Sequence, residues 1–392
     1  MTAPSRQPVA VLYKGHSEFN SLNTMVDHWA AALRAKGMRP EIVDLRSADA
    51  IARTVALIRT EPVALFLSLN GYGVPKPGQG AGFYQETRAP LFVYFVDHPV
   101  YHHPIIRSEV PQLVATFPTP SHLRFCRSRV RSDLPLLHLP HTAAPGPAAP
   151  WSERDIPVLL AGSLHEDPER KRAGWIEHGA PVRDRLEEII SGHRAEPRRP
   201  LHDIVLEVLN LPEPPVELLC SYFSLADTYL RSVVRLEFLC AASGLPVTLV
   251  GRGWDAAALP ASSKLRLLGE RPVAELFELM ARAKIVLNLL PPYYESHERP
   301  FQAMAHGAAA ATVAAPWLLG AVGAGSVLAL PPDPGEAAEA TLAALADDGA
   351  LATLAAAGTA AFLAGHTWDH RLSRVLGWIK SVKPGSLVGV GN

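Results

Sequence analysis

The chain has 392 residues, of which 48% are hydrophobic and 19% charged, and its formal net charge is -1. This length predicts two domains with separate cores. The near-zero charge argues against a nucleic-acid-binding protein and against binding to an anionic membrane. Cys126, Cys220 and Cys240 are odd in number and widely spaced, which argues against a disulfide framework and against a structural zinc site.

The chain also carries no obvious targeting signal. Its N-terminal segment, MTAPSRQPVAVLYKG, lacks a long apolar stretch, so no signal peptide is expected. No run approaches the roughly 18 uninterrupted apolar residues of a membrane-spanning helix, and we expect no transmembrane segment. These features predict a cytoplasmic protein.

The N-terminal half alternates short apolar runs with segments of helical periodicity. One helix begins near Leu22 and ends before Gly37, and another is expected over roughly 48–59. Near-continuous apolar runs between helices indicate a parallel sheet that is covered on both faces. The strands of this half are expected at 8–13, 40–45, 63–69, 90–96, 113–118 and 134–140.

Residues 142–156, TAAPGPAAPWSERDI, are rich in Pro, Ala and Gly and are predicted to be a linker. A second alternating series follows it, interrupted by a long helical insertion at about 168–243. We therefore expect an N-terminal domain over 1–150, a C-terminal domain over 156–365, and a final helix within 366–392. Both domains are predicted to be doubly wound α/β folds that face a cleft. The strands of the second series are expected at 156–162, 246–254, 264–270, 283–290, 308–313 and 326–331.

A run of polar side chains, Ser296, His297, Glu298 and Arg299, stands between an expected strand and a segment that begins at Pro300. Pro is favoured at the first position of a helix, which predicts a helix from Pro300. A helix N-terminus at the carboxyl end of a strand favours anions. Arg299 could then bind a phosphate, and Glu298 the hydroxyls of a sugar. The alternative is a helix cap with a surface ion pair.

Glycines follow three other expected strands of the C-terminal half. Gly162 and Ser163 end the first, Gly253 and Arg252 the next, and Gly269 the third. Glycine allows a phosphate to approach the backbone closely. The simplest ligand for this set is a nucleotide diphosphate. We add Trp254 and Glu270, which adjoin these turns, to the residues expected to bind it.

The N-terminal half has its own polar strand ends. Asp97 and His98 follow a buried strand, with His102 and His103 just beyond; a carboxylate beside an imidazole suits a general base that deprotonates a hydroxyl. A structural loop or a metal site is the alternative, although Pro99 and Pro104 interrupt helical ligand spacing, and no metal is expected. Four further side chains are expected to face an acceptor, namely Lys14, His16, Asn70 and His141.

The motifs VGRGW, KIVLNLL, SHERPFQAMAHGA and HTWDHRLSRVL occur in an order that resembles group-1 glycosyltransferases of the GT-B fold. The likeness is to a bacterial branch that includes spore-maturation-type proteins, and it covers about 156–380 well. It implies a C-terminal domain that holds a nucleotide sugar, an N-terminal domain that holds the acceptor, and a final helix that crosses back to the N-terminal domain. Many relatives carry two Glu residues where this chain has Tyr294 and Gln302, so the way the donor is oriented does not transfer directly.

The sequence therefore predicts a metal-independent glycosyltransferase of the hexosyltransferase type, with no cofactor and a nucleotide-diphosphate sugar as donor. Arg252 and Arg299 would stabilise the departing diphosphate, and Asp97 with His98 would activate the acceptor. The acceptor is expected to be a polysaccharide, a small molecule or a protein, and not a nucleic acid. A nucleotide-sugar epimerase and a catalytically inactive nucleotide-sugar-binding module are the alternatives. The stereochemistry stays open.

Overall fold

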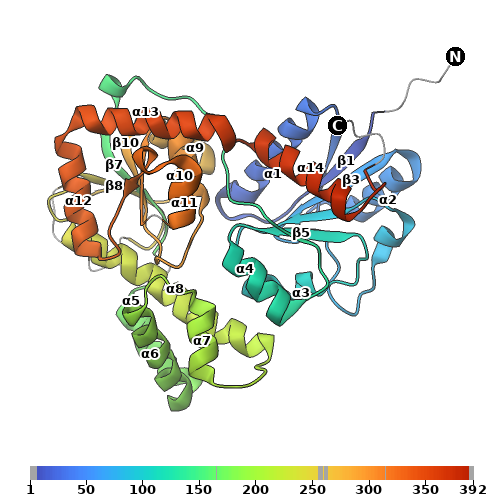
Figure 1. The fold of residues 1–392 in the computed structure, drawn as a ribbon, viewed down its shortest axis with the longest axis horizontal. Helices are drawn as coiled ribbons and strands as arrows, with labels where there is room; N and C mark the ends of the chain where they lie inside the picture. Colours follow the sequence, from blue (N-terminus) through green and yellow to red (C-terminus); the bar gives the residue numbers. More distant parts are fainter. Residues whose placement is uncertain (1–6, 165, 255–258, 260–263, 314, 388–392) are drawn as a thin grey trace. The chain divides into compact units, whose positions relative to one another are not determined.

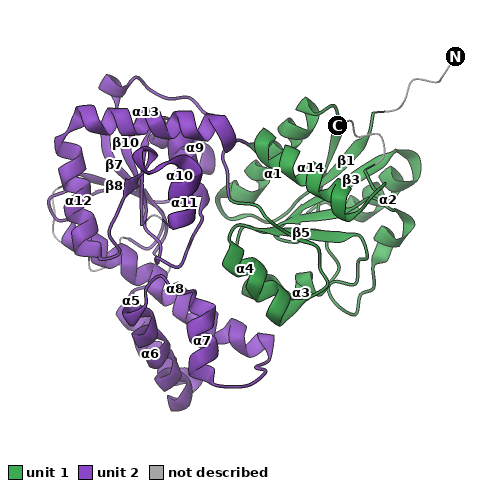
Figure 2. Ribbon diagram, in the orientation of Figure 1, with its two compact units in different colours: residues 1–140, 368–392 green, residues 141–367 purple. Residues whose placement is uncertain are grey.

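A computed structural model describes residues 7–164, 166–254, 259, 264–313 and 315–387. The chain forms two compact units (Figures 1 and 2). Unit 1 is made of Met1–Pro140 and Trp368–Asn392, and unit 2 is made of His141–Thr367. Both termini thus belong to unit 1, and unit 2 is inserted between its parts.

Unit 1 is built on a six-stranded sheet with the order β2-β1-β3-β4-β5-β6, and every neighbouring pair of its strands is parallel. The order reverses direction between β1 and β3, so the switch point of this sheet lies at the carboxyl ends of these two strands. The strands are β1 (Val9–Lys14), β2 (Arg39–Asp44), β3 (Val63–Leu69), β4 (Leu91–Tyr94), β5 (Leu113–Phe117) and β6 (Leu136–His138).

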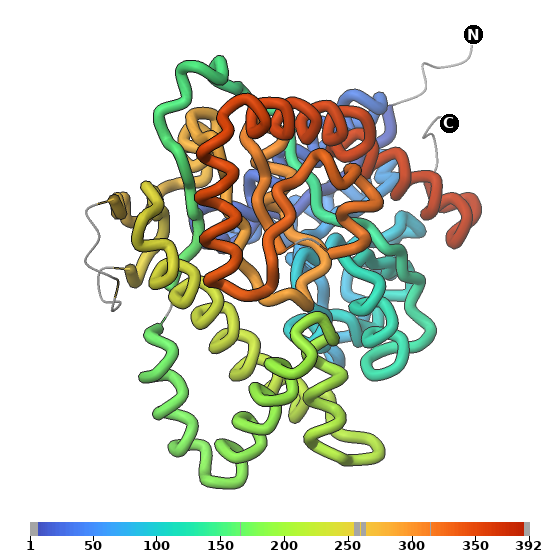
Figure 3. The backbone as a smooth tube through the Cα atoms, turned by 60° about the vertical axis from the view of Figure 1, so that its left-hand side comes forward, coloured from blue at the N-terminus to red at the C-terminus, as the bar shows by residue number. Residues whose placement is uncertain are grey.

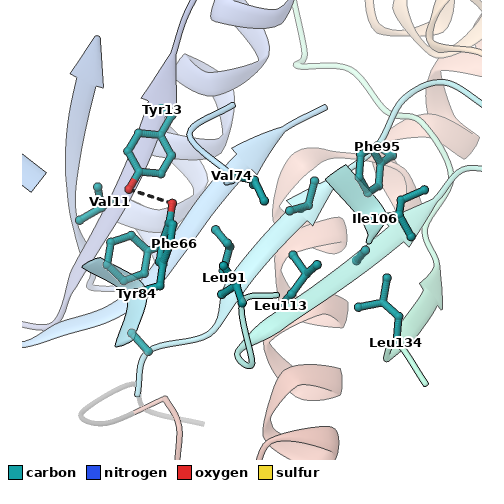
Figure 4. Packing of buried hydrophobic residues seen from close by; sticks show 14 of the residues in the cluster. Val11, Tyr13, Phe66, Val74, Tyr84, Leu91, Phe95, Ile106, Leu113 and Leu134 are labelled. Carbon is teal, nitrogen blue, oxygen red and sulfur yellow. Dashed lines mark hydrogen bonds between the residues drawn. The ribbon is translucent and has the colours of Figure 1, made fainter. Parts of the chain in front are cut away.

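One face of this sheet carries a dense apolar core (Figure 4). The Tyr84 hydroxyl donates to the hydroxyl of Tyr13 at 3.2 Å, and the rings of Phe95 and Phe117 stack with their centroids 4.9 Å apart. Burial of these side chains supplies most of the driving force for this layer. The helices of unit 1 are α1 (Ser21–Ala35), α2 (Ala50–Thr60), α3 (His103–Ile106), α4 (Pro120–Phe125) and α14 (Trp368–Val382).

Helix α14 completes unit 1 from the far end of the sequence. Trp368, at its start, is 5% exposed, and its ring centroid lies 5.1 Å from that of Trp29 on α1. The Arg371 guanidinium donates to the carbonyl oxygen of Pro140 at 3.0 Å. Figure 1 shows α14 lying alongside α1. The last helix is therefore part of the unit 1 core.

Unit 2 is built on a second parallel sheet, with the order β12-β11-β10-β7-β8-β9. Its order reverses between β10 and β7, so their carboxyl ends form the switch point of unit 2. Two doubly wound parallel sheets confirm the expected fold class. The strands are β7 (Ile156–Ala161), β8 (Val247–Val250), β9 (Arg266–Leu267), β10 (Ala283–Asn288), β11 (Ala309–Thr312) and β12 (Leu328–Ala329).

Apolar layers cover both faces of this sheet. Val158 and Leu160 of β7 pack with the first layer and Leu159 with the second, because successive side chains of a strand point to opposite faces. Phe238 of α8 lies in the first layer and Phe301 of α10 in the second. The helices are α5 (Pro168–Gly174), α6 (Ala180–Ala195), α7 (Leu201–Leu209), α8 (Val216–Ala241), α9 (Val273–Arg282), α10 (Glu298–Ala305), α11 (Pro316–Val322), α12 (Pro334–Ala346) and α13 (Asp348–Gly365).

The predicted helical insertion forms α5 to α8. Figures 1 and 3 show α5, α6 and α7 extending from the sheet of unit 2 beside the first part of the long helix α8. The other end of α8 packs on the sheet through buried residues such as Phe238 and Leu239. Helix α8 therefore joins this helical arm to the sheet.

The Pro-rich segment 142–156 is fixed to unit 2. Ala143 pairs with Thr367 in an isolated parallel bridge. The backbone N–H of Gly146 donates to the carbonyl oxygen of Ala305, and Arg154 donates to the carbonyl oxygens of Ala283 and His306. Backbone and guanidinium hydrogen bonds thus hold in place a segment whose composition is typical of a linker.

Helix α13 is, in the described part of the chain, long and apolar enough to cross a membrane by length and composition. It packs in unit 2, where Leu351, Ala355 and Phe362 are buried. A single helix of this kind does not establish a membrane span.

Candidate functional site

The carboxyl ends of β7 and β10 are the first place to look for a ligand site, because they form the switch point of unit 2. Gly162 and Ser163 follow β7, and Leu289 follows β10. Arg235 of α8 connects the two ends: its Nη1 donates to the carbonyl oxygen of Ser163 at 2.7 Å and its Nε to that of Leu289 at 3.4 Å. A guanidinium therefore lies at the switch point.

The glycines after β7 and β8 bring two backbones together. A Cβ atom on Gly251 would lie 2.4 Å from the carbonyl oxygen of Gly162, and one on Gly253 would lie 1.8 Å from that of Leu164. Both glycines also have positive φ, +138° and +84°, which other residues rarely adopt. The structure thus explains these two glycines by close packing of loops, without a phosphate.

Trp254 supports the same pair of loops. Its side chain is 3% exposed in the apolar core, and its indole N–H donates to the carbonyl oxygen of Gly162 at 2.7 Å. The Ser163 hydroxyl accepts from the backbone N–H of Arg252 at 3.3 Å. Trp254 therefore packs in the core beneath these loops and stabilises them through its indole hydrogen bond.

The third turn is exposed. Gly269 accepts through its carbonyl oxygen from the backbone N–H of Gly251 at 2.9 Å. Glu270 lies with its carboxylate 3.8 Å from the guanidinium of Arg252, and both side chains are about half exposed. Arg252 and Glu270 therefore form a solvated ion pair at the end of β8 and β9.

Helix α10 begins earlier than the sequence predicts. It starts at Glu298, with His297 as the N-cap, and Pro300 is its third residue; the prediction of a start at Pro300 was wrong. Pro fits here because the first-turn N–H groups have no partner within the helix. The His297 Nδ1 accepts from the backbone N–H of Arg299 at 3.2 Å. The backbone N–H of Arg299 at the helix N-terminus is thus bonded to His297, whereas the sequence predicts that such N–H groups bind an anion.

This hydrogen bond determines which ring nitrogen of His297 carries the proton. Because Nδ1 accepts a hydrogen bond, the ring proton is on Nε2, which lies 3.3 Å from the Glu298 carboxylate. Burial holds the pKa of His297 well below its ordinary value, and the charges of Arg299, His141, Arg231 and Arg235 act in the same direction. His297 is therefore neutral at neutral pH and orients the Glu298 carboxylate.

Arg299 lies at the carboxyl end of β10 with a neutral partner. Its Nη1 donates to Oδ1 of Asn288 at 3.1 Å, while the Asn288 amide donates to the Thr312 hydroxyl at 3.0 Å. Burial lowers the pKa of Arg299. Among the described residues neither Arg299 nor Arg235 forms an ion pair, so both cations are available for an anion.

His141 lies with this group in unit 2. Its Nδ1 is 3.0 Å from the Ser296 hydroxyl, which also accepts from the His141 backbone N–H at 3.4 Å. Its ring centroid is 5.9 Å from that of His297. The residue that the sequence analysis assigned to the acceptor is thus found beside residues assigned to the donor.

Sequence reasoning missed the cations of the helical arm. Arg231 and Arg235 are one helical turn apart on α8, and the buried carboxylate of Asp227 lies one turn before them. The signal was present, since charged residues at i and i+4 on a largely apolar helix indicate a buried polar row. What the row faces could not be known, because Ser163 and Leu289 are distant in sequence.

Together Lys171, Arg231, Arg235 and Arg299 form what we call the cationic cluster. Burial lowers the pKa of Arg235 to about 9, and the charges of Arg231 and Arg299 add to this effect. Burial also lowers the pKa of Lys171; the charge of Glu166 opposes this effect, Arg231 adds to it, and Asp227 opposes it. Cations that depress one another's pKa lie close together and favour an anionic ligand.

Unit 1 presents a different group at its strand ends. The Asn70 amide donates to the Asp97 carboxylate at 2.8 Å, and His102 Nε2 lies 3.6 Å from the same carboxylate oxygen. His98 is 4% exposed, and its Nδ1 accepts from the backbone N–H of Val100 at 3.0 Å. His98 thus caps a short 3₁₀ helix, and His102 is the histidine beside Asp97.

The remaining residues predicted to bind an acceptor in unit 1 lie at the carboxyl end of β1. Lys14 pairs with Asp27 of α1 at 2.7 Å. His16 is exposed, and its carbonyl oxygen accepts from the Tyr72 hydroxyl.

Within the ranges that the structure describes, no group of three or more His, Cys, Asp or Glu residues could hold a metal ion.

Comparisons with known proteins agree with this architecture. Residues 231–377 match the family model described as glycosyl transferase-like. No curated protein sequence matches the chain significantly. The chain is similar in structure to the sucrose-phosphate synthase of Thermosynechococcus elongatus, with a TM-score of 0.56 and 14% identity over 96% of this chain and 99% of that one.

Two further structures show the same likeness. The Anabaena protein HepE, in complex with UDP and glucose, has a TM-score of 0.53 and 12% identity over 94% of this chain and 99% of that one. An alpha-glucosyltransferase in complex with UDP and a 13-mer DNA has a TM-score of 0.53 and 10% identity over 95% and 100%. The fold is that of the GT-B glycosyltransferases. The family match and this GT-B fold support the transfer of a sugar from a nucleotide sugar.

Proposed function

We propose that the chain is a group-1 hexosyltransferase whose cationic cluster binds the diphosphate of a nucleotide-sugar donor. The observation that carries the proposal is Arg235, a buried guanidinium that connects the ends of β7 and β10 and, among the described residues, donates to two carbonyl oxygens. Five N–H groups on one guanidinium leave donors for a phosphate after two have been used. The glycosyl transferase-like match over 231–377 begins on this segment of α8.

The cluster would act on the leaving group. When the bond between sugar and diphosphate breaks, negative charge develops on the diphosphate, and fixed cations stabilise it without reorganisation. Arg235 and Arg299 are fixed by their carbonyl and amide partners. We propose that these guanidinium groups supply the charge that a metal ion supplies in other transferases, so that the reaction is metal-independent.

We propose that unit 1 acts on the acceptor through Asp97 and His102. Asn70 holds the carboxylate, which lies 3.6 Å from Nε2 of His102. An imidazole beside a carboxylate is suited to accept the proton of an acceptor hydroxyl. This assignment replaces His98 of the sequence prediction, whose Nδ1 is engaged in a helix cap.

The acceptor we propose is a polysaccharide, a small molecule or a protein of the bacterial cytoplasm, in keeping with the resemblance to the spore-maturation-type branch. A structural neighbour was crystallised with DNA. The formal net charge of -1 in this chain argues against a nucleic acid as acceptor. Transfer of label to DNA in a competition with glycan and protein acceptors would contradict this choice.

The test is a panel of nucleotide sugars, read by thermal shift and by release of the nucleotide, on wild type and Arg299→Ala. We expect one donor to stabilise the wild type and to be hydrolysed slowly, and both effects to be lost in the variant. Arg282→Ala is the matched control, because Arg282 pairs with Asp155 at the opposite, amino-terminal edge of the same sheet. Equal binding by wild type and Arg299→Ala would contradict the assignment of the diphosphate to the cationic cluster.

The same panel separates the transferase from an inactive binding module, for which the presence of Tyr294 and Gln302 in place of two Glu residues is the specific argument. Stabilisation by a donor without turnover, with every acceptor class present, would favour the binding module. Conversion of the donor sugar without any acceptor would instead indicate an epimerase.

A further inference from the structure

A fully buried carboxylate lies beside the cations of the cluster. The side chain of Asp227 on α8 is fully buried. Its Oδ1 accepts from the hydroxyls of Tyr293 and Tyr294 at 2.7 and 2.8 Å, and its Oδ2 lies 3.5 Å from Nη1 of Arg231. The guanidinium of Arg231 also lies 5.9 Å from the centre of the Tyr294 ring. Asp227 thus joins the helical arm to the loop that follows β10.

The negative charge of Asp227 reaches most of the cluster. It acts on the pKa of Lys171 and of Arg235, in each case against the effect of burial. Charges within a partly dehydrated site interact over several ångströms with little screening. An anion bound by Arg231, Arg235 and Arg299 would therefore also meet the field of Asp227.

A cluster of this kind has to bind an anion strongly and still release it. Transferases of this class stabilise the diphosphate in the transition state, and the same diphosphate then has to leave as product. Release of product limits turnover in many enzymes. Glu166 and Glu298 oppose Lys171 and Arg299, but without a carboxylate beside Arg231 the cluster would hold the product more tightly.

We propose that Asp227 is a built-in counter-charge that weakens the binding of the nucleoside diphosphate product and so permits its release. The proposal rests on the proposed function, because it assigns the diphosphate to the cationic cluster. It makes Asp227 a positioning residue that acts on the ligand through the field at Arg231, Arg235 and Lys171. Most buried polar residues of a binding site increase affinity, and this one is expected to decrease it.

The charge of Asp227 and its geometry can be changed separately. Asp227→Asn removes the charge and keeps an oxygen that accepts from the two tyrosine hydroxyls. Tyr294→Phe removes one of these hydrogen bonds and keeps the charge. If Asp227 acts through its field, only the first variant changes the affinity strongly; if it acts only by holding the loop, both variants weaken binding.

The experiment is a calorimetric titration of the full chain with UDP, GDP, ADP and inorganic pyrophosphate, with dissociation rates of fluorescent nucleotides measured by stopped flow. We expect Asp227→Asn to tighten binding about ten-fold or more, as removal of one unit charge several ångströms away implies. The dissociation rate and the steady-state kcat should fall together, while the first turnover stays fast. Tyr294→Phe should change the affinity less than about two-fold.

A second variant covers the case in which Asp227→Asn does not fold. The triple variant Asp227→Leu, Tyr293→Phe, Tyr294→Phe replaces the buried carboxylate and hydroxyls with apolar side chains and leaves Arg231, whose side chain is 33% exposed, in contact with solvent. It also removes the charge, so it should tighten binding in the same direction. Unchanged or weaker binding in the folded variant would overturn the proposal, as would a Tyr294→Phe variant that behaves like Asp227→Asn.

The titration also distinguishes this proposal from the proposed function. If the wild type binds neither a nucleoside diphosphate nor pyrophosphate, both the counter-charge and the proposed function are contradicted. Wild type that binds and loses binding in Arg299→Ala, while Asp227→Asn does not bind more tightly, contradicts the counter-charge alone.

Discussion

Both sheets are parallel and doubly wound, and they place different chemistry at the carboxyl ends of their strands. In unit 1 the groups after β3 and β4 are an amide, a carboxylate and an imidazole, with the Asp97 side chain about half exposed. In unit 2 the groups at the ends of β7 and β10 are guanidinium groups of α8 and α10, and Arg235 is 5% exposed. A hydroxyl to be deprotonated suits the first set, and a diphosphate suits the second. The difference shows that both units offer strand ends for a ligand and that the side chains there decide what each unit binds.

The largest effect is expected when the cation at the unit 2 switch point is removed. Arg235→Met keeps the length of the side chain and removes its charge, so affinity for the nucleoside diphosphate should fall about 100-fold or more, as for the loss of a buried charged partner. The melting temperature should change little, because removing a buried cation offsets the loss of two carbonyl partners. Calorimetry and thermal unfolding measure the two effects. Retained affinity would mean that unit 2 has no special preference for anions.

The matching change in unit 1 should leave binding of the nucleotide intact. We expect His102→Asn to lower kcat about 100-fold, in the range found for the loss of a general base, with the affinity for UDP unchanged. His98→Asn should instead lower the melting temperature, since His98 is buried and caps a 3₁₀ helix. Steady-state kinetics on both variants distinguish them. An equal loss of kcat in both would return His98 to the role that the sequence predicts.

A smaller effect concerns the helical arm, and it is a pH dependence. Burial lowers the pKa of His193 on α6 to about 4, from an ordinary value of ~6.5. The unfolded chain therefore binds more protons between these two values. The contribution of His193 to the free energy of unfolding is fully present above pH 6.5 and is lost as the pH falls toward 4, with a slope of up to about 1.4 kcal/mol per pH unit.

His193→Phe keeps a ring beside Tyr293, 5.3 Å away in the wild type, and removes the titration. Urea unfolding at pH 7 and pH 5, with hydrogen exchange in α6 as the local probe, should show a smaller loss of stability in the variant. Parallel pH profiles for the two proteins would place the acid sensitivity elsewhere.

The smallest effect is expected at the exposed turn of unit 2. Arg252→Ala removes the ion pair with Glu270, whose partners are about half exposed. Exposed pairs contribute roughly 0–1 kcal/mol, so affinity for the donor should fall no more than about five-fold. A loss as large as that of Arg235→Met would show that the ligand extends to the ends of β8 and β9, and would restore Arg252 to the role that the sequence predicts.

Most strands could be predicted from the sequence because they are short apolar runs between breaks, and a strand buried on both faces needs no other signal. The start of α10 could not, since Pro300 is compatible with any position in the first turn and the cap is a His, an uncommon choice. The polar run 296–299 pointed to the switch point. The residues that complete it, Arg231 and Arg235, come from a helix more than 50 residues earlier in the chain, and only the folded structure brings them there.

Unit 1 cannot be completed until the end of the chain is made. Trp368 and Arg371 of α14 pack on Trp29 and on the Pro140 carbonyl, so part of the unit 1 core is synthesised after all 227 residues of His141–Thr367. A chain emerging from the ribosome folds its domains as they become available. All residues of unit 2 are therefore synthesised before unit 1 is complete, although unit 1 begins earlier in the chain. A truncation before residue 368 would leave unit 2 intact and would expose Trp29.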